Sequence, residues 1–296
     1  MNYTEKGSKL YLFSIVLVAV IGGLLFGYDT AVISGAEKGL QAFFMGADFE
    51  YTDAIHGITS SSALIGCIIG SAVSGFFASG LGRKNSLFLA GILFFLSALG
   101  SYYPEFLFFE HGVPSYSLLV AFNFYRVLGG IGVGLASAIC PMYIAEIAPS
   151  NIRGTLVSWN QFAIIFGQLV VYFVNFLILG SHANPVIDLV NGVNQIMNPE
   201  AAAWTTETGW RLMFVSEAVP AGLFALLVLL VPETPRYLAM CGKDERALNV
   251  LSRINGASQA KVILAEIKAT TEEKTERLFT YGWMVIFIGI MLSVFQ

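Results

Sequence analysis

Six segments of the chain are long and apolar enough to cross a bilayer as helices, which takes about 20 residues. They run over Leu10–Ser34, Gly57–Leu81, Asn85–Tyr103, Ser117–Tyr143, Thr155–Leu179 and Leu212–Val231. Lipid offers no hydrogen bonds to the backbone, so such segments must be helices or strands of a closed barrel, and barrel strands are much shorter. The sequence therefore predicts an all-α membrane protein with a six-helix bundle over residues 1–232.

The composition supports this prediction and excludes several function classes. Of the 296 residues, 56% are hydrophobic and 12% are charged, against about 25% charged in soluble domains. The net charge of -4 without a clustered basic face argues against nucleic acid as a partner. Cys67, Cys140 and Cys241 are far apart, so they predict neither a disulfide framework nor a metal site, and we expect no cofactor.

Small residues recur at every fourth position in two of the apolar segments. One series is Ser62, Gly66, Gly70, Ser74 and Ala78, and the other is Gly130, Gly134 and Ala138. Such faces let the backbones of membrane helices approach closely. We therefore expect both series to be helix–helix contacts.

Residues 233–277 follow the sixth segment and are rich in charge, with apolar side chains at helical spacing, such as Leu248, Leu251 and Ile254. They predict short cytoplasmic linker helices, with a disordered linker as the alternative. A seventh apolar segment begins near Leu278 and continues to Gln296 without a flanking polar residue. We expect residues 278–296 to be a truncated seventh transmembrane helix.

Lysine and arginine placement predicts the orientation, because cytoplasmic loops of membrane proteins are enriched in these residues. The N-terminal tail, the connections after the second and fourth segments, and residues 233–277 hold most of the basic residues, while the opposite side has few. The sequence therefore predicts a multi-pass protein of the cell inner (plasma) membrane with a cytoplasmic N-terminus and the lipid bilayer as a partner.

Asp29 in the first segment and Arg126 in the fourth are ionisable groups at membrane depth. Such groups cost at least about 2.5–3.5 kcal/mol to insert and are functional candidates. Arginine keeps its charge in proteins, whereas a carboxylate that gains and loses an arginine partner can release and take up a proton. A proton-carrying pair and a static ion pair both remain open.

Gln161, Gln168 and Asn175 are spaced seven apart in the fifth segment, so they follow one helix face and drift by only about 20° per step. Tyr172 lies one turn beyond Gln168 on the same side, and Phe26 offers an aromatic face. Amides both donate and accept hydrogen bonds, which suits a neutral polyhydroxylated ligand such as a sugar. Interhelical hydrogen bonding is the alternative.

Several motifs in this order resemble the sugar porter family of the major facilitator superfamily. They are Gly23–Thr30, Gly82-Arg83-Lys84, Arg126 with the following glycines, Pro141–Pro149 with Arg153-Gly154, Gly209-Trp210-Arg211 and Pro232–Arg236. Within the family, the likeness is greatest to members that carry D-xylose together with a proton. The sequence departs from the family at Ser79 and Gly80, where an acidic or amide residue and an arginine are usual, which puts part of a cytoplasmic latch in doubt.

The resemblance implies a major facilitator fold of twelve spans in two halves with the sugar between them. The chain would supply the first half, and the missing second half would be required. The residues that the resemblance assigns are Asp29 and Arg126 for proton coupling, Phe26, Gln161, Gln168 and Gln296 for substrate binding, and Arg83, Glu146, Arg153, Glu217, Glu233 and Arg236 for a cytoplasmic charge network.

The function expected from these observations is D-xylose–proton symport by alternating access, with a small-molecule sugar and a proton as partners. A proton-independent facilitator of another sugar is one alternative, although Asp29 argues against it. A membrane fragment that does not transport is the other. An enzyme is not expected, because the polar residues form no nucleophile–base pair and no metal-ligand set.

Overall fold

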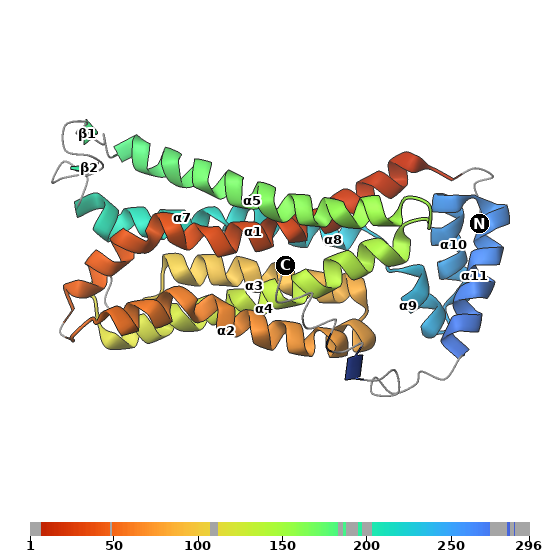
Figure 1. The fold of residues 1–296 in the computed structure, drawn as a ribbon, viewed down its shortest axis with the longest axis horizontal. Coiled ribbons are helices and arrows are strands. Elements are labelled where there is room, and N and C mark those ends of the chain that lie inside the picture. Colours follow the sequence, from red (N-terminus) through yellow and green to blue (C-terminus); the bar gives the residue numbers. More distant parts are fainter. Residues whose placement is uncertain are drawn as a thin grey trace.

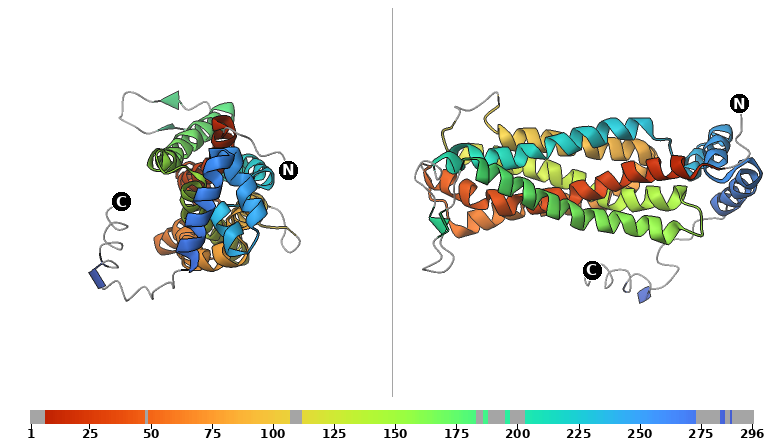
Figure 2. Two further views of the ribbon diagram at one scale, coloured as in Figure 1. Left: turned by 90° about the vertical axis from the view of Figure 1, so that its right-hand side faces the viewer. Right: turned by 90° about the horizontal axis from the view of Figure 1, so that it is seen from above.

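The computed structural model describes residues 7–47, 49–106, 112–182, 186–187, 195–196, 203–272, 283–284 and 287. Within this part of the chain, six helices are long and apolar enough to cross a membrane. They run side by side along the long axis of the molecule (Figure 1, Figure 2), which confirms the predicted all-α bundle.

The first five membrane helices are α1 (Lys9–Met45), α2 (Asp53–Gly80), α3 (Arg83–Tyr102), α4 (Tyr116–Ile147) and α5 (Arg153–His182). Side-chain oxygens of Ser8, Thr52 and Ser115 cap α1, α2 and α4 by accepting a hydrogen bond from the backbone N–H three residues on. Such caps satisfy backbone donors that have no partner within the helix.

Helix α1 continues well past Ser34, where its apolar segment was expected to end, and stops at Met45. Ala36, Leu40 and Phe44 recur at helical spacing in this extension and are buried. The extension therefore has an apolar face to pack, although its other face is polar. The expected end was too early because it followed overall hydrophobicity and not this periodicity.

The sixth membrane helix is interrupted. It comprises η1 (Thr205–Gly209), α7 (Trp210–Ser216) and α8 (Ala218–Leu230), with Glu217 at the break. Pro220 explains the break, because proline has no N–H to donate to the carbonyl of Ser216 four residues earlier. Glu217 itself keeps helical dihedral angles (φ -66°, ψ -25°), and its side chain is buried in the interior of the bundle.

Three shorter helices gather at one end of the bundle (Figure 1), namely α9 (Pro235–Met240), α10 (Asp244–Asn255) and α11 (Ala257–Glu272). The start of α1 lies at the same end, where the Ser8 N–H donates to the Arg253 carbonyl at 2.8 Å. At the opposite end, β1 (Val186–Ile187) pairs antiparallel with β2 (Gln195–Ile196). The expected seventh helix falls outside the described residues except at 283–284 and 287.

The small-residue faces are helix contacts, as predicted. All five small residues of the α2 series are buried. A Cβ on Gly70 would lie 2.3 Å from the Ile131 carbonyl oxygen of α4, and a Cβ on Gly130 would lie 2.0 Å from that of Ala63. The same close approach joins α1 to α5, where a Cβ on Gly27 would lie 1.8 Å from the Ile164 carbonyl oxygen. These glycines let the helix backbones touch.

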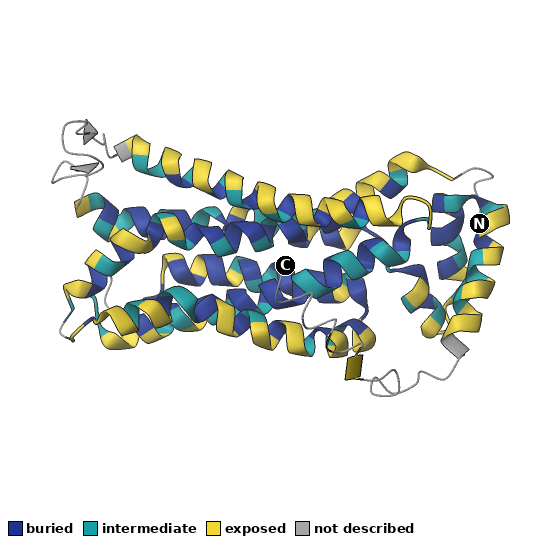
Figure 3. Ribbon diagram, viewed as in Figure 1, coloured by how far each residue is buried: buried dark blue, intermediate teal, exposed yellow. Residues whose placement is uncertain are grey.

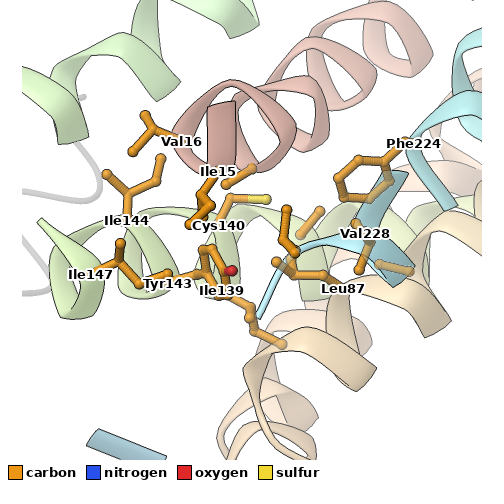
Figure 4. Packing of buried hydrophobic residues seen from close by; sticks show 14 of the residues in the cluster. Ile15, Val16, Leu87, Ile139, Cys140, Tyr143, Ile144, Ile147, Phe224 and Val228 are labelled. Carbon is orange, nitrogen blue, oxygen red and sulfur yellow. The ribbon is translucent and has the colours of Figure 1, made fainter. Parts of the chain in front are cut away.

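The apolar interior forms two clusters along the bundle axis. The linker-end cluster lies toward α9 and α10 and is drawn in Figure 4. It includes Ile15, Val16, Leu87, Ile139, Cys140, Tyr143, Ile144, Ile147, Phe224 and Val228. The loop-end cluster lies toward the other end and includes Tyr28, Val32, Leu40, Phe44, Phe122, Trp210 and Phe214.

The outer faces of α2 and α5 are largely exposed (Figure 3), and many of the exposed side chains are large and apolar. On α5 they include Phe162, Ile165, Leu169, Phe173 and Phe176. An apolar surface of this kind is rare on soluble monomers and suits contact with lipid or with further membrane helices.

Candidate functional site

Three ionisable side chains lie where the two apolar clusters meet. Asp29 comes from α1, Arg126 from α4 and Glu217 from the break between α7 and α8. On α4 and on the sixth membrane helix, the charged residue separates the linker-end cluster from the loop-end cluster, and on α1 the two clusters meet between Leu25 and Tyr28, next to Asp29. None of the three is more than 2% exposed. The charged site is therefore surrounded by apolar side chains at both ends.

Arg126 and Asp29 are directly paired, as the sequence suggested. Nη1 of Arg126 donates to Oδ1 of Asp29 at 2.5 Å, and Nη2 donates to the Asp29 carbonyl at 3.4 Å. The guanidinium also lies over the ring of Phe214, 5.0 Å from its centroid. These contacts hold the arginine against α1 and α7 at once.

Glu217 completes the site, although the resemblance assigned it to the cytoplasmic charge network. Its carboxyl interacts electrostatically with both Asp29 and Arg126. Among the described residues, no contact joins it to Arg83 or Glu146. The structure thus places Glu217 beside Asp29 and Arg126 and not beside the Arg83–Glu146 pair.

Several polar atoms of this site have no hydrogen-bond partner within the described part of the chain. They are Oδ2 of Asp29, Nε of Arg126 and Oε1 of Glu217. Two ionised carboxylates beside one guanidinium leave one negative charge in a dry interior, and a single added proton neutralises it. Because an uncompensated charge is costly there, the arrangement is chemically suited to binding one proton.

A cavity of about 890 Å³ lies between α1, α4 and α5, and its lining extends to Ala145 and Arg153 at the linker end; Asp29, Arg126 and Glu217 do not line it. Phe26, one turn before Asp29 on α1, lines it together with Gln161 and Asn160 of α5 and Ser137 of α4. The cavity thus combines an aromatic ring with amides and a hydroxyl, which suits a ligand bearing hydroxyl groups. The structure brings together Phe26 and Gln161 of the expected substrate residues.

The other expected amides diverge from this cavity. Gln168 is half-buried and does not line the cavity, while Asn175 is buried. The Asn175 side chain donates to the Val32 carbonyl at 3.4 Å and packs against Gly35, so it belongs to the α1–α5 contact. Gln296 lies outside the described residues.

At the linker end, Arg83 and Glu146 form an ion pair at 2.7 Å. Glu146 accepts a second hydrogen bond, at 2.6 Å, from the Thr234 hydroxyl at the start of α9. Arg83 also donates to the Ala78 carbonyl at 3.2 Å and lies over the Tyr237 ring. The pair therefore joins α2, α3, α4 and α9.

Glu233 caps the start of α3. Its carboxylate accepts hydrogen bonds from the backbone N–H groups of Arg83, Lys84 and Thr234 at 2.8–3.2 Å. Gly82, at φ +90°, takes the left-handed conformation that turns the chain here. Burial raises the pKa of Glu233, while hydrogen bonds from the backbone of Thr234, Lys84 and Arg83 oppose the shift.

Arg153 and Arg236 are both exposed and line a cavity of about 500 Å³ that Glu146 also borders. The structure thus places both arginines near the Arg83–Glu146 pair. Among the described residues, neither Arg153 nor Arg236 forms an ion pair.

A second buried ion pair joins Glu105 and Arg211 and was not predicted from the sequence. The two guanidinium nitrogens of Arg211 donate to the two Glu105 oxygens at 2.8 and 2.5 Å. Burial alone would raise the pKa of Glu105, but the hydrogen bonds and charge of Arg211 hold that pKa below its usual value. Arg211 belongs to a recognised motif, but nothing in the short segment around Glu105 marks it as the partner.

No group of three or more His, Cys, Asp or Glu side chains suited to a metal ion occurs in the part of the chain that the structure describes.

Residues 15–296 match the family model for Sugar (and other) transporter. The chain is 46% identical to the D-xylose-proton symporter of Escherichia coli (strain K12), over 97% of this chain and 57% of the relative. It is 35% identical to the arabinose-proton symporter of Bacillus subtilis (strain 168), over 99% of this chain and 57% of the relative. The chain thus spans a little over half the length of these relatives.

Among solved structures, the chain is similar to the proton:xylose symporter XylE, a major facilitator superfamily protein, bound to 6-bromo-6-deoxy-D-glucose. The TM-score is 0.84 at 46% identity, over 97% of this chain and 59% of the other.

Proposed function

Because the chain belongs to the family of sugar (and other) transporters, we propose that it serves the symport of D-xylose with a proton by alternating access. The observation that carries this proposal is the buried constellation of Asp29, Arg126 and Glu217, which is one proton short of neutrality. Proton-coupled uptake requires a site that binds a proton, whereas uptake of a neutral sugar alone does not. Similarity to the D-xylose-proton symporter of E. coli supports the choice of sugar.

The proposed coupling step is a proton transfer to Asp29. The proton adds to the unpartnered Oδ2 atom, and the neutral carboxylic acid then attracts Arg126 less strongly. Glu217, whose carboxyl group also interacts with Arg126, stays beside the guanidinium. Release of Arg126 from α1 allows α1 and α4 to move relative to each other, which couples protonation to the conformational change.

The proposed sugar site is the cavity between α1, α4 and α5, with Phe26 against the apolar face of the sugar ring and Gln161 bonded to its hydroxyls. Gln168 does not line this cavity and Gln296 lies outside the described residues, so we propose both as further substrate residues on the resemblance to the family alone. The matched relatives extend well beyond this chain. We therefore propose that residues 1–232 form one membrane bundle and that transport requires a second bundle.

The proposed orientation places the N-terminus and residues 233–277 in the cytoplasm of a cell whose inner membrane holds the protein. The network of Arg83, Glu146, Arg153, Glu233 and Arg236 then lies on the cytoplasmic side. There it would latch the linker helices to the bundle in one state of the transport cycle and release them in the other.

Proton movement on sugar addition tests the proposed function. D-xylose added to weakly buffered, non-energised cells that make the complete gene product should turn the medium alkaline, because each sugar brings in a proton. Cells that lack the gene serve as the control. Xylose uptake without alkalinisation would instead indicate a facilitator.

A further inference from the structure

A cavity of about 550 Å³ lies at the linker end, where α9 and α10 meet the turn between α2 and α3. It is separate from the proposed sugar cavity and shares no lining residue with it. Four basic side chains line it, one from α3 and three from α10 and the residue that precedes it. They are Lys84 at the start of α3, Lys243 and Arg246 at the start of α10, and Arg253 near the end of α10. We call it the basic cavity.

The basic cavity has a large excess of positive charge. The only acidic side chain that lines it within the described residues is Glu233. Both Glu233 oxygens already accept hydrogen bonds from the backbone of Arg83, Lys84 and Thr234. The neighbouring Asp244 is paired with Lys268, and Glu245 does not line the cavity. Among the described residues, the four cations therefore lack a carboxylate counter-ion of their own.

The contacts of the basic side chains leave donors available to a ligand. Lys84 donates to the Leu229 carbonyl at 2.7 Å, and Arg253 lies over the Tyr11 ring, 5.6 Å from its centroid. Within the described part of the chain, Lys243 and Arg246 form no ion pair, and both are exposed. Asn85 and Asn249 add amide groups to the wall.

We propose that the basic cavity binds a phosphate group, carried by an anionic phospholipid or by a soluble phosphorylated compound. Guanidinium forks and ammonium groups recognise phosphate oxygens, and basic pockets at the cytoplasmic ends of membrane helices suit anionic headgroups. A bound phosphate would bridge α10 to the start of α3 beside the Glu233 cap. It would therefore hold the linker helices on the bundle.

Thermal unfolding of the purified chain tests this site. In dodecyl maltoside, inorganic phosphate is titrated against chloride of equal ionic strength, and micelles containing phosphatidylglycerol are compared with micelles containing phosphatidylcholine. The test variant is Lys243→Gln/Arg246→Gln. The matched control is Lys38→Gln/Lys261→Gln, which removes the same charge from two exposed lysines outside the cavity.

We expect phosphate or phosphatidylglycerol to raise the unfolding midpoint, with an apparent affinity at least tenfold weaker in the test variant and unchanged in the control. If the double variant does not fold, Lys243→Gln alone should weaken the affinity at least threefold. A response to inorganic phosphate identifies the phosphate group as sufficient, and a response to phosphatidylglycerol alone identifies a lipid headgroup. No rise with either probe, or equal weakening in both double variants, would overturn the proposal.

Discussion

Nη1 of Arg126 lies 2.5 Å from Oδ1 of Asp29, and neither side chain is more than 2% exposed. A buried ion pair adds little net stability, because the cost of removing two charges from water offsets their attraction. The second Asp29 oxygen has no hydrogen-bond partner among the described residues, and Glu217 adds another carboxyl. The site therefore fits proton binding better than the fastening of helices.

Gln168→Ala should weaken D-xylose binding at least tenfold in the complete gene product, because an amide both donates to and accepts from sugar hydroxyls. Isothermal titration calorimetry measures the affinity. Asn175→Ala is the matched control, since Asn175 is buried against α1. It should lower the unfolding midpoint and leave the affinity unchanged. Unaltered binding in Gln168→Ala would reassign that amide to helix packing.

Glu105→Gln should destabilise the chain by about 3–5 kcal/mol, because it leaves the buried charge of Arg211 without its carboxylate. The folded-state pKa of Glu105 is lowered. Its contribution to stability is therefore present above the usual glutamate pKa and is lost as the pH falls through the lowered value. Unfolding midpoints measured from neutral to acidic pH should show the variant and the parent chain converging. A constant difference would contradict this account.

Glu233→Ala should destabilise the fold by about 1 kcal/mol, because the start of α3 loses its capping acceptor. Glu233→Gln keeps one acceptor oxygen and should cost less.

Because the folded-state pKa of Glu233 is raised, the stability linked to its protonation is present below the usual glutamate pKa and is lost as the pH rises through the raised value. The unfolding midpoint of the parent chain minus that of Glu233→Gln should therefore decrease as the pH rises from the usual glutamate pKa to the raised one. An increase of this difference with pH would refute the prediction.

Gly70→Ala should destabilise the bundle by about 1–3 kcal/mol, because the added Cβ would lie 2.3 Å from the Ile131 carbonyl oxygen and push α2 from α4. Gly75→Ala on the same helix is the control, since a Cβ there meets nothing within 4 Å. It should be neutral or slightly stabilising. Equal unfolding midpoints for the two variants would show that α2 and α4 do not need this close contact.

The sequence predicted the membrane helices and the Asp29–Arg126 pair because both follow from strong physical constraints. Bilayer thickness sets the length of an apolar helix, and a charge at membrane depth requires a partner. Arg126 and Asp29 are the charges of opposite sign that lie deepest in the first and fourth spans, so their pairing was foreseeable.

The positions that the sequence did not predict depend on how the helices pack. Seven-residue spacing correctly placed Gln161 and Asn175 on one face of α5. Because α5 runs along α1, this face lines a cavity at Gln161 but packs against α1 at Asn175. The resemblance assigned Glu217 to the cytoplasmic network, whereas its place inside the start of the sixth segment brings it beside Arg126 of α4 once the helices pack. The Glu105–Arg211 pair joins distant segments that no motif connects.

Asp29→Asn in the complete gene product tests the central claim most directly, since asparagine keeps the size of the side chain but takes up no proton. Labelled D-xylose is followed in energised cells for accumulation and in de-energised cells for exchange across the membrane. We predict that accumulation and sugar-dependent alkalinisation are lost while exchange persists. Accumulation of xylose above the external concentration by the variant would contradict the assignment of Asp29 as the proton-carrying group.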